Sequence, residues 1–180
     1  MIITIIVAVI LLVIILLFNQ IIREENAVKN AFSTVDVLLK KRYDLIPNLV
    51  EIVKGHASHE KEVFENISQI RNKLVNTQDA ELAVKSDSEL NFALKELFMV
   101  AEEYPNLKTN TSFLELQKNL LLLEDELSAA RRTYNAAVTE YNITLESFPT
   151  NIVANLMQKT KKALFTVTDD VRNVINLKNI

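Results

Sequence analysis

Two histidines are the residues whose type and spacing come nearest to a metal site. His56 and His59 lie three positions apart, close to two glutamates, and side chains at this spacing share one face of a helix. Their order, His-Ala-Ser-His-Glu, reverses the His-Glu-x-x-His pattern of zinc proteases, and the sequence holds only these 2 histidines. We therefore predict no metal site and no cofactor, and keep both residues only as weak candidate ligands.

A second group of polar residues surrounds a turn that is expected near Pro47. The group comprises Asp36, Arg42, Asp44, Asn48, Glu51 and Lys54. Two interpretations stay open. These residues form a binding surface or subunit contact, or they serve as caps, intrahelical ion pairs and a solvated helix face.

A Tyr-Asn pair occurs twice, as Tyr134-Asn135 and Tyr141-Asn142, at a spacing of seven that returns each pair to the same helix face. Tyrosine at such a position is more often a core residue with its hydroxyl at the edge. We expect the neighbouring asparagines to hydrogen-bond to an adjacent helix and fix its register, in preference to contacting a ligand.

Composition excludes several classes of chemistry. With 1 glycine the chain has no phosphate-binding loop, and with 0 cysteines it has no disulfide, thiol chemistry or zinc finger. A net charge of −3 without a basic face argues against nucleic acid as a partner. No Ser-His-Asp set is present, so we predict that the protein is not an enzyme.

The first 18 residues, MIITIIVAVILLVIILLF, carry no charged side chain. As a helix they span roughly 27 Å, close to the thickness of a hydrocarbon core. Their insertion is favourable by an energy on the order of 7 kcal/mol. A cleaved signal peptide is disfavoured, since no basic residue precedes Arg23 and no small-x-small site follows. We predict a transmembrane helix over 1–18, with the later basic residues favouring a bundle on the cytoplasmic side.

The rest of the chain shows helical periodicity with few breaks. We predict a bundle over 19–154, with helices at about 19–43, 47–75, 88–103 and 112–148, and a C-terminal tail over 155–180. Proline at position 47 disfavours helix at the residue before it and marks the first boundary. Ser112 and Glu115 form a capping-box pattern that opens the longest helix, and the apolar residues of this helix, like those of 19–43, recur at 3-4 spacing. The expected fold is all-α: an elongated, antiparallel up-down helical bundle behind an N-terminal transmembrane helix.

Several stretches resemble the LemA family. The most specific is DVLLKKRYDLIPNLVEIVKG over 36–55, supported in order by YPNLK over 104–108, RRTYNAAVTEYN over 131–142 and the Phe-Pro that follows. His56 departs from the pattern, because the family usually has an aromatic residue there. The resemblance implies a bacterial protein with an N-terminal membrane segment and a helical-bundle domain. It assigns no biochemical activity, although some family relatives are linked to magnetosome membrane formation.

These observations favour a non-enzymatic, single-pass protein of the bacterial inner (cytoplasmic) membrane. Its expected partners are the lipid bilayer, further copies of itself in a homo-oligomer, and unidentified proteins. We expect it to act as a scaffold through self-assembly or partner binding. Two alternatives stay open: a membrane-remodelling or envelope-stress oligomer, and a metal-binding sensor that uses His56 and His59.

Overall fold

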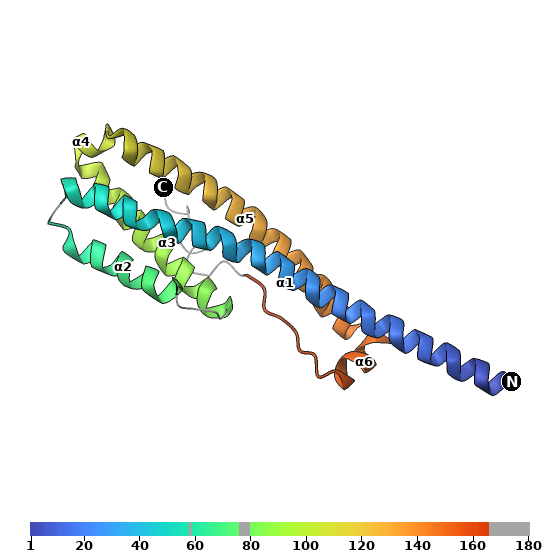
Figure 1. Cartoon of the computed structure of the whole chain (residues 1–180). Helices are drawn as coiled ribbons and strands as arrows, with labels where there is room; N and C mark the ends of the chain where they lie inside the picture. The colour runs from blue at the N-terminus through green and yellow to red at the C-terminus, as the bar shows by residue number, and fades with distance from the viewer. Residues whose placement is uncertain (58, 76–79, 166–180) are drawn as a thin grey trace, which may run out of the picture. The chain divides into compact units, whose positions relative to one another are not determined.

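The computed structural model describes residues 1–57, 59–75 and 80–165, and in this part of the chain the fold is all-α, as predicted (Figure 1). The helices are α1 (Ile2–His56), α2 (Lys61–Val75), α3 (Ala80–Glu103), α4 (Pro105–Lys108), α5 (Thr111–Glu146) and α6 (Thr150–Leu156). The described residues divide into two compact units. Unit 1 contains residues 1–36 and 129–165, and unit 2 contains residues 37–128.

Unit 1 is built on the first part of α1 and the last part of α5, which run side by side in opposite directions (Figure 1). Both helices contribute buried residues at heptad-like spacing, because such residues return to one face every two turns. The core residues are Ile21, Val28 and Val35 from α1, Tyr134, Val138, Tyr141 and Leu145 from α5, and Val153 and Ala154 from α6.

The apolar run at the start of α1 is the candidate membrane segment. Among the described residues, α1 is the one helix that is long and apolar enough to cross a membrane. Its most apolar 18-residue window is 0% buried, and helix α1 continues from it without a break into the packed residues of unit 1. The apolar run and part of the core of unit 1 therefore lie on the same helix.

Unit 2 contains the second part of α1, the helices α2, α3 and α4, and the first part of α5. Helix α2 packs against α3, and α4 connects α3 to α5 (Figure 1). Its largest fully buried side chains are Ile46, Leu49, Val53, Ile67, Leu90, Leu97, Leu107 and Leu127. Apolar stripes on each helix thus close a core in the way that bundles do.

The predicted helix boundary at Pro47 is wrong, because α1 continues through this residue to His56. Proline has no amide hydrogen, so the carbonyl of Tyr43, four residues earlier, loses its usual helical donor. Arg71 of α2 supplies a replacement, since its Nε donates to the Tyr43 carbonyl oxygen at 3.1 Å. A tertiary hydrogen bond therefore satisfies the group that proline would leave unpaired.

This arrangement predicts that Pro47 and Arg71 are energetically coupled. Arg71→Met should destabilise the protein by about 2 kcal/mol, the value of a hydrogen bond from a charged donor. In a Pro47→Ala background the new amide can bond to the Tyr43 carbonyl, so the same change should cost about 1 kcal/mol less. Urea unfolding of the four proteins of this double-mutant cycle measures the coupling. Equal costs in both backgrounds would contradict it.

Other boundaries differ in smaller ways. Helix α3 begins at Ala80 instead of residue 88, whereas α5 agrees with the predicted 112–148 within two residues. Its cap is Asn110 and not Ser112, because the Asn110 side-chain oxygen accepts from the Phe113 amide at 3.1 Å. Of the predicted tail, residues 155–165 belong to unit 1, and 166–180 lie outside the described residues.

Candidate functional site

Of the six residues in the predicted polar surface near Pro47, five are exposed and one is buried. Asp36, Asp44, Asn48, Glu51 and Lys54 are exposed on α1. Arg42 is not, because it is 5% exposed. This burial does not fit a residue of an open surface, and the use of the six residues as a contact remains a prediction.

Arg42 instead joins three helices of unit 2. Its Nη1 lies 3.0 Å from the Glu124 carboxylate of α5, and its Nη2 donates to the side-chain oxygen of Asn91 on α3. The planar guanidinium suits this role, since it presents several donors in a fixed fork. The charged side chain of Arg42 therefore makes a contact inside unit 2, which could not be predicted from the residue type alone.

The two histidines do not share a helix face. His56 is the last residue of α1, and His59 lies in the turn before α2. Both are exposed, and the Nδ1 of His56 lies 3.0 Å from the Ile52 carbonyl oxygen of its own helix. In the part of the chain that the structure describes, no three His, Cys, Asp or Glu side chains gather as a metal would require.

The most specific polar arrangement is a pair of asparagine side chains on α5 that hold an extended segment in unit 1. The Asn135 amide donates to the Phe165 carbonyl at 2.9 Å and accepts from the Phe165 amide at 2.8 Å. Asn142 forms the same pair of bonds with Lys162, at 3.0 and 2.9 Å. We call these two asparagines with residues 159–165 the clasp.

The spacing of the clasp follows from the geometry of its two partners. Two turns of α5 separate the asparagines, which is roughly 10.5 Å along the helix. Three residues of extended chain separate Lys162 from Phe165, which is roughly 10 Å. Each side-chain amide therefore meets one backbone unit and pairs with it as a neighbouring strand would.

Aromatic contacts support the clasp. The ring of Tyr134 lies edge-on to Phe165, with centroids 4.9 Å apart, and contacts Phe32 of α1 at 5.8 Å. Its hydroxyl donates to the Ala163 carbonyl at 3.3 Å. The Lys162 ammonium lies 5.7 Å from the ring centre of Tyr141. Burial raises the pKa of the Tyr134 phenol, so this hydroxyl remains a donor at neutral pH.

An ion pair ties the same segment to α1. The Lys159 ammonium lies 2.7 Å from the Glu25 carboxylate, and both side chains are mostly buried. This hydrogen bond holds the pKa of Glu25 below its ordinary value and raises the pKa of Lys159 above its own. Both groups are therefore charged across the physiological range.

Half of the clasp is recognisable in the sequence. The burial of both tyrosines confirms their prediction as core residues. The asparagines were expected to bond to a neighbouring helix, and their actual partner is extended backbone. The repeat at a spacing of seven was the available signal, whereas residues 159–165 carry no periodicity of their own that points to it.

The clasp gives a local prediction. Asn142→Ala removes two hydrogen bonds, worth about 2 kcal/mol together, so the Lys162 amide should exchange with solvent about thirtyfold faster. Hydrogen–deuterium exchange of the full chain in detergent measures this rate. Asn119→Ala is the control, because Asn119 is an exposed asparagine of the same helix. Equal exchange in both variants would show that the amide pair does not hold the segment.

The ion pair gives a pH dependence. Since the pKa of Glu25 is lowered from 4.5, the pair contributes fully to stability above pH 4.5 and loses its contribution as the pH falls through the lowered pKa. The melting temperature of the wild type should exceed that of Glu25→Gln at neutral pH, and the two should converge in acid. A difference that persists at pH 2 would be inconsistent with this role.

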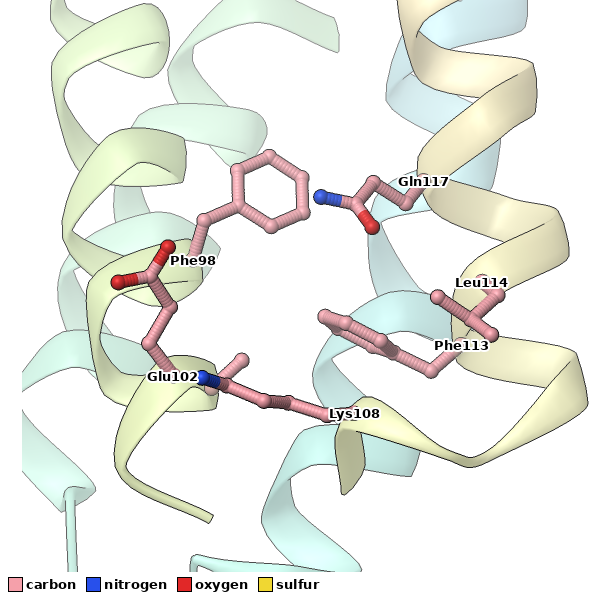
Figure 2. Close-up of a pocket in the computed structure, with 7 residues that line it drawn as sticks. Phe98, Glu102, Lys108, Phe113, Leu114 and Gln117 are labelled. Atoms are coloured by element: carbon pink, nitrogen blue, oxygen red, sulfur yellow. The ribbon is translucent and has the colours of Figure 1, made fainter. Parts of the chain in front are cut away.

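A small pocket in unit 2 is a poor candidate for a ligand site. Figure 2 shows the rings of Phe98 and Phe113 at the pocket, with the polar ends of Glu102, Lys108 and Gln117 around it. Its volume is 210 Å³, below the roughly 300–1,000 Å³ of pockets that enclose small molecules. The Phe98 and Phe113 rings pack edge to face, 6.3 Å apart, with Phe113 buried and Phe98 half-buried.

In the part of the chain that the structure describes, the fold and the clasp define an all-α protein with one candidate membrane span and side chains of α5 that bind an extended segment. The sequence profile of the LemA family matches residues 31–178. The chain therefore belongs to the LemA family, which confirms the resemblance found in the sequence.

Named relatives agree with this assignment. The chain is 28% identical over 152 residues to Protein LemA of Metamycoplasma hominis, which covers 84% of this chain and 69% of the relative. It is 24% identical over 148 residues to Magnetosome protein MamQ 1 of Paramagnetospirillum magneticum, and 23% identical to Magnetosome protein MamQ of Magnetospirillum gryphiswaldense. These magnetosome matches cover 68% of this chain and 54% of each relative. None of these names is that of an enzyme.

Proposed function

We propose that this protein is a non-enzymatic, single-pass membrane scaffold that works through self-assembly or through binding of a partner protein. The observation that carries the proposal is the continuity of α1. Its exposed apolar run leads directly into buried residues of unit 1, beginning at Ile21. Attachment to the membrane and packing of the bundle therefore depend on the same helix, which suits a protein that organises others at a bilayer.

The proposed location is the bacterial cytoplasmic membrane, with the helical units on the cytoplasmic side. Arg23, Lys29, Lys40 and Lys41 follow the apolar run, and positive residues beside a span favour the cytoplasm. Digestion of sealed inverted vesicles tests this orientation. Proteases should degrade residues beyond the run in inverted vesicles and leave them intact in right-side-out vesicles, and the opposite pattern would reverse the assignment.

The clasp supports an assembly role. Its asparagines bond to backbone atoms of Lys162 and Phe165 and to no particular side chain of the segment. Recognition of extended backbone is a common mode of peptide binding, and it allows one segment to be exchanged for another of the same kind. We therefore assign self-assembly to exchange of residues 159–165 between copies of this chain.

Sedimentation in detergent tests the scaffold. The wild type should associate as its concentration rises, and Asn135→Ala with Asn142→Ala should weaken this association. Asn119→Ala should leave it unchanged, because that asparagine is exposed and takes no part in the clasp. A wild type that stays monomeric at every concentration would exclude self-assembly and leave only partner binding.

A second candidate function is membrane remodelling by such an assembly. The observation that favours it is similarity to relatives named as magnetosome proteins. Electron microscopy of liposomes that contain the full-length protein separates the two functions. Spherical vesicles with an associated protein would support the scaffold alone, whereas deformed vesicles would support remodelling.

A further inference from the structure

The corner between α5 and α6 in unit 1 exposes an apolar cluster. Phe148, Ile152 and Leu156 are 81%, 55% and 80% exposed. The other side of α6 is packed, with Val153 and Thr150 buried. We call the three exposed residues the apolar corner. Its exposure needs an explanation, since a cluster of large apolar side chains in water commonly marks a contact surface.

The corner is held firmly against unit 1. The Thr150 hydroxyl lies 2.5 Å from the Thr144 carbonyl oxygen and 2.7 Å from that of Ser147. The Asn151 amide donates to the Ser147 carbonyl at 2.8 Å. These bonds and the buried face of α6 fix the direction in which the apolar corner points.

The antiparallel register of α1 and α5 shows which part of α1 lies at the same height as the apolar corner. Tyr134 contacts Phe32, and two turns further along α5 the Tyr141 ring lies under Lys162 of the segment whose Lys159 pairs with Glu25. Each step of seven residues up α5 therefore matches a step of seven residues back along α1. One more such step back along α1 leads from Glu25 to Phe18, the last residue of the apolar run, while α5 ends at Glu146 and Phe148 lies in the turn that follows, near the same level.

We infer that the apolar corner is a second membrane contact, seated in the interfacial layer of the bilayer beside α1. The inference rests on the proposed function, because it requires the apolar run to span the membrane. A helix that leaves the bilayer at Phe18 places the end of α5, and Phe148 just after it, near the same depth. Aromatic and aliphatic side chains are favourable in this layer, where one side is apolar and the other is wet.

Charged groups close in sequence to Phe148 and to Phe18 are compatible with this depth. Lys161 forms an ion pair with Glu146, and Arg23 pairs with Glu24 at 3.4 Å. The Lys161 and Arg23 side chains are 59% and 76% exposed, so both remain accessible to lipid headgroups.

Tryptophan fluorescence provides a direct test, because the sequence has 0 tryptophans. Phe148→Trp and Leu156→Trp each create a single reporter at an exposed site that should not disturb folding. In full-length protein in phosphatidylcholine vesicles, lipids brominated near the headgroup should quench both reporters about twofold. Thr133→Trp is the control. It lies exposed on α5, roughly 20 Å along the helix from the end at Glu146, and should not be quenched.

A fourth variant separates this inference from the proposed function. Leu12→Trp reports the apolar run itself and should be quenched by lipids brominated deep in the acyl chains. Quenching of Leu12→Trp without quenching of Phe148→Trp or Leu156→Trp would overturn the corner and keep the anchor. Absence of quenching in all variants would overturn the anchor. Blue-shifted corner reporters that escape quenching would show that protein, such as a second copy, covers the corner, and would also overturn the inference.

Discussion

Two arginines in the middle of the apolar run, Val9→Arg with Val13→Arg, should abolish stable membrane association. Each arginine near the centre of a span costs about 3 kcal/mol, so the pair cancels most of the favourable insertion energy, which is on the order of 7 kcal/mol. Both positions are exposed in the structure and contribute nothing to the core of unit 1. The measurement is the fraction of protein that stays in the membrane pellet after alkaline carbonate extraction.

The matched control places two arginines further along the same helix, at Thr34 and Val37, which are also exposed. This variant adds the same charge and should remain in the pellet. Circular dichroism of both variants checks that the helices persist. If the Val9 and Val13 double variant also stayed in the pellet, another part of the chain would have to anchor the protein.

The elements that the sequence predicted well are those whose pattern is local. The apolar run needs no partner to be recognised, because its length and lack of charge are sufficient. Helix α5 was found within two residues at each end, since its apolar residues recur at 3-4 spacing without glycine or proline. These signals lie within each segment, so the element can be predicted without knowledge of its tertiary neighbours.

The features that the sequence did not predict correctly depend on tertiary contacts. A proline usually ends a helix, yet Pro47 lies inside α1, where Arg71, 28 residues beyond Tyr43, donates to the Tyr43 carbonyl in place of the amide hydrogen that proline lacks. Residues 159–165 were missed for a similar reason, since side chains of α5 define their extended path. Neither the Arg71 bond nor the asparagine bonds can be predicted from local spacing, because each depends on which segments become neighbours in the fold.

Arg42 is a third residue whose environment depends on tertiary contacts. Its substitution should have the largest effect on stability of those considered. Arg42→Ala should lower the free energy of unfolding by about 3 kcal/mol, because it removes a buried charged group from its partners. The loss includes the ion pair with Glu124 and the hydrogen bond to Asn91, and leaves space among α1, α3 and α5. Urea unfolding of the full chain in detergent, followed by circular dichroism, measures the change.

The neighbouring Lys41 is the control for charge. It is exposed on the same helix, so Lys41→Ala removes a positive charge without breaking a buried contact and should change stability by less than about 0.5 kcal/mol. Arg42→Lys should fall between the two, since lysine keeps the charge but lacks the planar fork that reaches both partners. If Arg42→Ala were as mild as Lys41→Ala, while binding or self-association was lost, Arg42 would belong to the interaction surface that the sequence indicated. A large loss of stability that lysine partly restores would place it in the core, where the structure has it.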